Sequence, residues 1–122
     1  MPVIAQVFAA LAAALHVVIF AMESVLWRRP QVWRRFGLAN QRDADVARPL
    51  AYNQGFYNLF LALGIIAGLI VGDTGGDAVV LFCCAAIVGA AVVLASTGAR
   101  YLQAAVVQGI TPALALVTAA VF

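Results

Sequence analysis

Charged residues are scarce in this chain. Only 10% of its 122 residues are charged, lysine is absent, and 66% are hydrophobic. A soluble domain is typically about 25% charged and about 45–50% apolar. Because a small globule exposes a large fraction of its residues, a soluble fold of this size could not bury so much apolar surface. The composition therefore excludes an ordinary soluble domain and predicts a protein of the lipid bilayer.

The residues that usually carry metal and redox chemistry are also few. There is one histidine, His16, and the two cysteines, Cys83 and Cys84, are adjacent in an apolar stretch. That spacing builds neither a disulfide framework nor a metal site, so we predict inert buried thiols, no metal and no other cofactor. The chain has no P-loop, no dinucleotide fingerprint and no nucleophile–base signature. Its arginines adjoin apolar stretches, which favours lipid rather than nucleic acid as the partner.

Four apolar stretches are long enough, or nearly so, to cross a membrane as helices of about 20 residues. They cover residues 3–27, 50–72, 78–95 and 101–122. They lack the alternation of a membrane barrel, and the first is too long for a signal-peptide core, so we interpret it as a retained span. We therefore predict an all-α, integral membrane four-helix bundle that forms one transmembrane domain, residues 1–122.

Arginine is distributed unevenly between the connections. Six arginines lie in the first connection, residues 28–49, and the seventh, Arg100, lies in the third. The second connection has no basic side chain; we expect Gly72 or Gly75 to end one helix there and Asp77 to cap the next. By the positive-inside rule, the first and third connections face the cytoplasm and both termini lie outside. We expect a multi-pass protein of the bacterial inner (cytoplasmic) membrane.

The first connection also contains a helix signal. Pro30 can open a short helix and Gly37 can close it, with Trp33 and Phe36 on one face. We interpret this segment as an interfacial helix among lipid headgroups. The alternative is a solvated basic loop with two incidental aromatic residues.

Glycine and proline mark two further spans. In the second span Gly64, Gly68 and Gly72 repeat every four residues, which predicts a surface for close helix packing. In the last span Pro112 predicts a kink that frees a backbone carbonyl near Gln108.

Two ionisable side chains lie inside the first span. His16 and Glu23 are seven residues apart, which is two helical turns, so they lie nearly on one line. Small residues on the same stripe allow another helix to approach, so both side chains face protein. An acid and an imidazole are costly in hydrocarbon, which makes them candidate catalytic acid–base residues. The alternative is that they only tie helices together, and both interpretations remain open.

Amide side chains occur at a similar depth in the second and fourth spans. At about 1.5 Å per residue, His16, Asn58 and Gln108 lie roughly 12–17 Å from the cytoplasmic surface, and Glu23 and Gln54 lie within roughly 10 Å of it. We predict a polar pocket in the cytoplasmic half of the membrane, with structural hydrogen bonding as the alternative. Its candidate ligand-binding residues are Gln54, Asn58, Gln108, Asn53 and Arg48.

The polar motifs together resemble a known family. They are a His-(x)6-Glu pair in the first span, the string Arg-Pro-Leu-Ala-Tyr-Asn-Gln-Gly-Phe-Tyr-Asn at residues 48–58, and Gln108-Gly109 in the last span. This combination resembles the small bacterial membrane proteins of domain-of-unknown-function family 1304. The resemblance covers essentially the whole chain; it implies a four-span membrane fold and no particular activity.

A looser likeness is to the membrane-associated eicosanoid and glutathione metabolism proteins. Those are four-span trimers with Arg and Asn early in the second helix, which Arg48 and Asn53 resemble with a spacing that differs by one. The acidic partner of that helix is missing here. The likeness therefore implies only an oligomer with sites between protomers.

These features favour a small homo-oligomer whose polar pocket binds an amphipathic or lipid-like ligand. The arginine-rich connection would hold an anionic group, and enzymatic activity is left open. One alternative is an accessory or assembly subunit of a larger membrane complex. Another is a transporter of small solutes or protons, although the outer half of the spans offers no matching polar lining.

Overall fold

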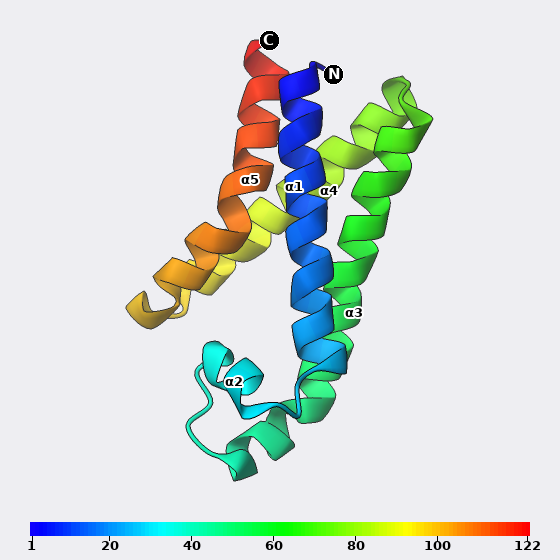
Figure 1. The fold of residues 1–122 in the computed structure, drawn as a ribbon. Helices are drawn as coiled ribbons and strands as arrows, with labels where there is room; N and C mark the ends of the chain where they lie inside the picture. The colour runs from blue at the N-terminus through cyan, green and yellow to red at the C-terminus, as the bar shows by residue number, and fades with distance from the viewer. The chain divides into compact units, whose positions relative to one another are not determined.

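The chain is built of helices without strands, and the computed structural model describes residues 1–122 (Figure 1). The α-helices are α1 (Val3–Phe20), α2 (Pro30–Trp33), α3 (Gln41–Val71), α4 (Thr74–Ser96) and α5 (Leu102–Val121). A π-helix follows α1 at Ala21–Val25, and 3-10 turns cover Arg34–Phe36 and Ala99–Tyr101.

Four helical segments have the length and apolar composition to cross a membrane. They are Val3–Val25, Gln41–Val71, Thr74–Ser96 and Ala99–Val121. The predicted all-α, four-span membrane architecture is therefore confirmed. The side of the membrane on which the termini lie stays a prediction.

The chain folds into two compact units, one of residues Met1–Leu15 and Leu61–Phe122 and the other of residues His16–Phe60. We call them the bundle unit and the arginine unit, and each is described by itself. The expectation of a single transmembrane domain is not tested by this division.

The bundle unit has a core of small side chains contributed by all four spans. Its buried residues are Ala9, Ala12 and Ala13 of α1, Ala62 and Ile65 of α3, Val80, Cys83, Cys84 and Ile87 of α4, and Ala115 of α5. Both cysteines are free thiols inside this core, as expected for residues that pack rather than react. Since lipid supplies no hydrophobic driving force between helices, close packing of small residues is what holds such a core together.

The glycine pattern of α3 contributes to this packing at two of its three positions. A Cβ built on Gly68 would lie 2.6 Å from the Gly76 carbonyl oxygen of α4, and one on Gly64 would lie 2.7 Å from Cys83 Sγ. Gly72 has a different role, because its φ of 68° ends α3 in the left-handed conformation that glycine tolerates.

The turn between α3 and α4 corrects one expectation about capping. Asp73, rather than Asp77, caps α4, because the Asp73 side chain accepts a hydrogen bond of 2.8 Å from the Gly76 amide. Asp77 lies in the first turn, where its carboxylate pairs with the Met1 ammonium group at 2.9 Å. This contact fixes the start of α1 beside the start of α4.

The arginine unit contains the short helix expected between Pro30 and Gly37. Pro30 is the first residue of α2, and Gly37 closes the following 3-10 turn with a φ of 84°. The aromatic residues turn inward: Trp33 is only 2% exposed, and the Trp27 ring contacts the Phe36 ring at a centroid distance of 5.2 Å. Trp27 Nε1 also donates a 2.9 Å hydrogen bond to the Ala44 carbonyl. The aromatic face thus forms a small core, and the arginines form the outer surface.

The helix α3 is longer than the span of residues 50–72 that the sequence predicted. It begins at Gln41, so residues 41–49 belong to a helix and not to a loop. Asn40 caps it, because Asn40 Oδ1 accepts from the Asp43 amide at 2.8 Å while Asn40 Nδ2 donates to Asp43 Oδ2 at 3.2 Å. The helix continues through Pro49. Figure 1 shows the first part of α3 running at an angle to the rest of the helix. A proline inside a helix removes a backbone hydrogen bond and is a common cause of such a bend.

Candidate functional site

Glu23 lies at a local irregularity of the first span. The α-helix gives way to a π-helix at Ala21–Val25, which closes with a hydrogen bond of 2.8 Å from the Leu26 amide to the Ala21 carbonyl. A π-turn inserts one extra residue into the helical path, so it changes the direction in which the next side chains point. Such turns occur frequently at functional sites, and here the turn carries the only acid inside an apolar stretch.

The Glu23 carboxyl group is bonded to the second span. Asn58 Nδ2 donates a 2.7 Å hydrogen bond to Glu23 Oε1, and the same amide lies 3.3 Å from the Gln54 carbonyl oxygen. Glu23 is 4% exposed, so this bond lies inside the arginine unit. The bond occupies Oε1, which leaves Oε2 to accept a hydrogen bond from a bound molecule.

The helices are brought together beside Glu23 by a serine and a glycine. Ser24 Oγ donates a 2.8 Å hydrogen bond to the Tyr52 carbonyl of α3. Gly55 faces this serine, and a Cβ built on Gly55 would overlap the Ser24 hydroxyl and lie 3.2 Å from Glu23 Cβ. The absence of a side chain at residue 55 is therefore what allows the two backbones to approach so closely.

The first span and α3 are also joined by a group of aromatic rings. The Phe56 ring contacts Phe20 at a centroid distance of 5.2 Å, Tyr52 at 5.1 Å and Phe60 at 6.3 Å. The contacts of Phe56 with Phe20 and Tyr52 are edge-on, an arrangement that is favourable for aromatic rings. Phe20 and Phe56 thereby add an aromatic contact between the first span and α3, the two elements that also carry Glu23 and Asn58.

His16 is the most deeply buried polar residue of this unit, with 1% of its surface exposed. It lies on α1 two turns before Glu23, as the spacing predicted. Glu23 Oε1 accepts its hydrogen bond from Asn58 Nδ2. This bond makes a carboxyl group and an amide a direct chemical pair of the site.

The other predicted site residues take different positions. Arg48, Asn53 and Gln54 are exposed on α3, and Gln54 contributes to the site through its backbone carbonyl. Gln108 is half-buried on α5, in the bundle unit. The prediction that these four residues and Asn58 bind a ligand stays a prediction.

Sequence reasoning missed Ser24 and Gly55. Ser24 directly follows the acid, and Gly55 interrupts a run of large polar and aromatic residues, which is the signal that was available. A glycine inside a helix is unfavourable by about 1 kcal/mol relative to alanine, so its presence there indicates a close contact.

Comparisons with known proteins identify a family without an activity. A family model described as "Protein of unknown function (DUF1304)" matches residues 10–120. No curated protein and no solved structure matches the chain. The matched range contains every side chain of the candidate site.

Proposed function

The chain belongs to the family of unknown function DUF1304, and we propose that it is a small membrane protein that binds the polar end of an amphipathic, lipid-like molecule at Glu23. The single observation that carries this proposal is the buried carboxyl group of Glu23, held at 2.7 Å by Asn58 on a π-turn. A polar pair that only joined two helices would not need an ionisable group, since two amides do the same at lower cost.

The chemistry of the pair limits the kind of ligand. A carboxyl group repels an anion, whether the anion is a carboxylate or a phosphate, in a medium of low dielectric constant. A hydroxyl or amine group can instead donate to Glu23 Oε2, while its apolar chain lies against rings such as Phe20 and Phe56. We therefore propose a ligand with a hydrogen-bond-donating head and a hydrophobic body.

The proposal extends to the setting of the site. A chain with four spans is small, and we propose that it acts as a homo-oligomer in the bacterial inner membrane with its arginine-rich connection in the cytoplasm. An enzymatic extension gives Glu23 or His16 the role of a general acid–base toward the bound head group.

Native mass spectrometry of the gently solubilised protein, followed by organic extraction, is the test. We expect a defined oligomer that retains an amphipathic molecule in stoichiometric amount, and we expect Glu23→Gln to lose it. Glutamine keeps the side-chain length and an oxygen that accepts from Asn58, so the variant should fold. A long-chain alcohol carrying a diazirine group serves as a defined probe and should crosslink beside Glu23.

The matched control is Asp45→Asn, which makes the same chemical change at an exposed acid of the same unit. It should retain the extracted molecule and the crosslink. The proposal fails if Glu23→Gln retains the same molecule as the unmodified protein. It also fails if the unmodified protein carries nothing and the alcohol crosslinks equally to both variants.

A further inference from the structure

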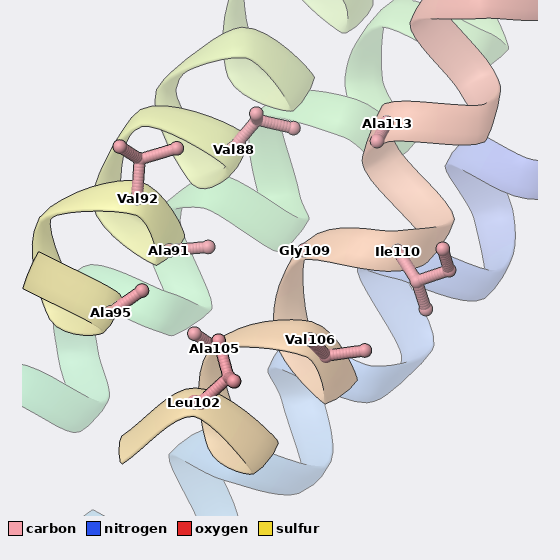
Figure 2. Close-up of a pocket in the computed structure, with 10 residues that line it drawn as sticks. All are labelled: Val88, Ala91, Val92, Ala95, Leu102, Ala105, Val106, Gly109, Ile110 and Ala113. Carbon is pink, nitrogen blue, oxygen red and sulfur yellow. The ribbon is translucent and has the colours of Figure 1, made fainter. Parts of the chain in front are cut away.

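A long apolar groove lies on the surface of the bundle unit between α4 and α5, remote in sequence from Glu23. It is an open groove of about 280 Å³, lined by ten residues without a polar side chain (Figure 2). Its floor is made of small residues, Ala91, Ala105 and Gly109. Its rims are larger side chains that remain about half exposed or more, Val92, Val106 and Ile110.

The floor of the groove lies deep because α4 and α5 are in close contact at Ala91 and Gly109. A Cβ built on Gly109 would lie 3.0 Å from the Ala91 Cβ, so no larger side chain fits between them. The volume is slightly below the roughly 300–1,000 Å³ of ordinary small-molecule sites. An open groove of this volume along two helices suits one linear hydrocarbon chain rather than a bulky ring.

The length of the groove matches one half of a bilayer. On α5 its lining runs from Leu102 to Ala113, which are eleven helical steps apart, or about 17 Å at 1.5 Å per residue. The hydrocarbon core of a membrane is about 30 Å thick, so one leaflet contributes about 15 Å. A groove that starts at the end of a span and stops near the midplane has the dimensions of a single acyl chain.

An arginine precedes the groove lining of α5 in the sequence by two residues. Arg100 lies in the 3-10 turn Ala99–Tyr101, directly before Leu102, and its guanidinium group lies 4.7 Å from the centre of the Tyr101 ring. Arg100 is exposed, and no acidic side chain pairs with it. An arginine and a tyrosine at the end of a span mark the headgroup level, where the guanidinium fork is suited to a phosphate.

A second copy of the chain fits this groove less well than a lipid. Copies related by an axis along the membrane normal carry the same residue at the same depth. A symmetric contact through this groove would place two Arg100 side chains near each other, which is unfavourable. An anionic head group instead complements the charge.

We propose that the α4–α5 groove binds one acyl chain of an anionic phospholipid whose phosphate is held by Arg100. The site is independent of Glu23, because every residue that forms it belongs to the bundle unit.

The test uses phosphatidylglycerol with a diazirine in its acyl chain, added to the full-length protein in detergent. We expect crosslinks on the groove residues of α4 and α5, and competition by unlabelled phosphatidylglycerol about fivefold stronger than by phosphatidylcholine with the same chains. Arg100→Gln should remove that preference without affecting the fold, because the side chain is exposed. Arg48→Gln, an exposed arginine outside the groove, is the control and should keep it.

A second variant tests the groove itself. Ala95→Leu fills its open end and should abolish the crosslinks, whereas Ala90→Leu adds the same volume at an exposed position of α4 outside the lining and should leave them unchanged. Crosslinks spread equally over the exposed faces of α4 would overturn the proposal, as would a preference for phosphatidylglycerol that Arg100→Gln leaves unchanged. Disulfide-linked dimers through Val92→Cys would also overturn it, by assigning the groove to a second copy.

Discussion

The contact between Ser24 and Gly55 controls how closely Glu23 can approach α3. The serine hydroxyl is already bonded to the Tyr52 carbonyl, so it cannot rotate away without breaking that bond. The carboxyl–amide bond between Glu23 and Asn58 lies next to this contact. At the scale of single residues, therefore, position 55 requires the absence of a side chain, and position 58 requires a hydrogen-bond donor.

Gly55→Ala should destabilise the protein by about 1–3 kcal/mol, because overpacking a tight contact forces neighbouring groups to move. Thermal unfolding in detergent, followed by the fluorescence of Trp27 and Trp33, measures the change. Gly89→Ala is the matched control, because a Cβ there meets no atom within 4 Å. Adding Ser24→Ala should recover part of the loss at Gly55→Ala; no recovery would mean that the serine is not the obstacle.

Asn58→Leu should cost about 1–2 kcal/mol, because it leaves a buried carboxyl oxygen without its donor. The same unfolding measurement applies. Asn53→Leu, an amide that is exposed on the same helix, should have little effect. If both variants unfold alike, the hydrogen bond to Glu23 contributes nothing particular to stability.

At the scale of secondary-structure elements, single glycine and proline residues determined several helix ends. The π-turn at Ala21–Val25 instead lies where the first span contacts α3. Gly37, Gly72 and Pro30 act as their residue types predict, since only backbone conformation is involved. The start of α3 also has a local signal, because Asn40 is a residue type that caps helices. The sequence interpretation instead began this span directly after Pro49. No local pattern predicts the π-turn at Glu23.

The same distinction explains the candidate site. Helical spacing correctly put Glu23 inside the protein. The depth estimate grouped Asn58 with His16 rather than with Glu23, whereas Asn58 donates its hydrogen bond to Glu23. Spacing alone does not fix the rotation of a helix, so Gln54 was expected to share the inward face of Asn58 although its side chain is exposed. Predicting Ser24 as a contact would have required knowing which helix packs against the first span.

Asp73→Ala should lower stability by about 1 kcal/mol, because it removes the side chain that caps α4. Thr74→Ala is the matched control at the next residue, where the side chain is exposed. Thermal unfolding of both variants in the same detergent provides the comparison. Equal midpoints for the two would show that the Gly76 amide is satisfied without Asp73.

On the scale of the whole molecule, the uneven distribution of charge is the feature that bears on the direction of insertion into the membrane. The arginines of the first connection are all on the surface of the arginine unit, and the one remaining arginine follows α4. The turn between α3 and α4 carries acids alone, and one of them is paired with the Met1 ammonium group. A chain with this pattern has one preferred way to insert, whatever ligand it binds.

Orientation can be measured with single reporter cysteines in a Cys83→Ala, Cys84→Ala background. Thr74→Cys places an exposed thiol in the acidic turn, and Ala39→Cys places one in the arginine-rich connection. Because moving an arginine through the membrane centre costs about 2.5–3.5 kcal/mol, the connection with six of them should stay in the cytoplasm. In intact cells of a bacterial host, a membrane-impermeant maleimide should therefore label Thr74→Cys, and Ala39→Cys only after permeabilisation. The reverse pattern would place Glu23 in the outer half of the bilayer, so that a ligand would reach it from the outer leaflet.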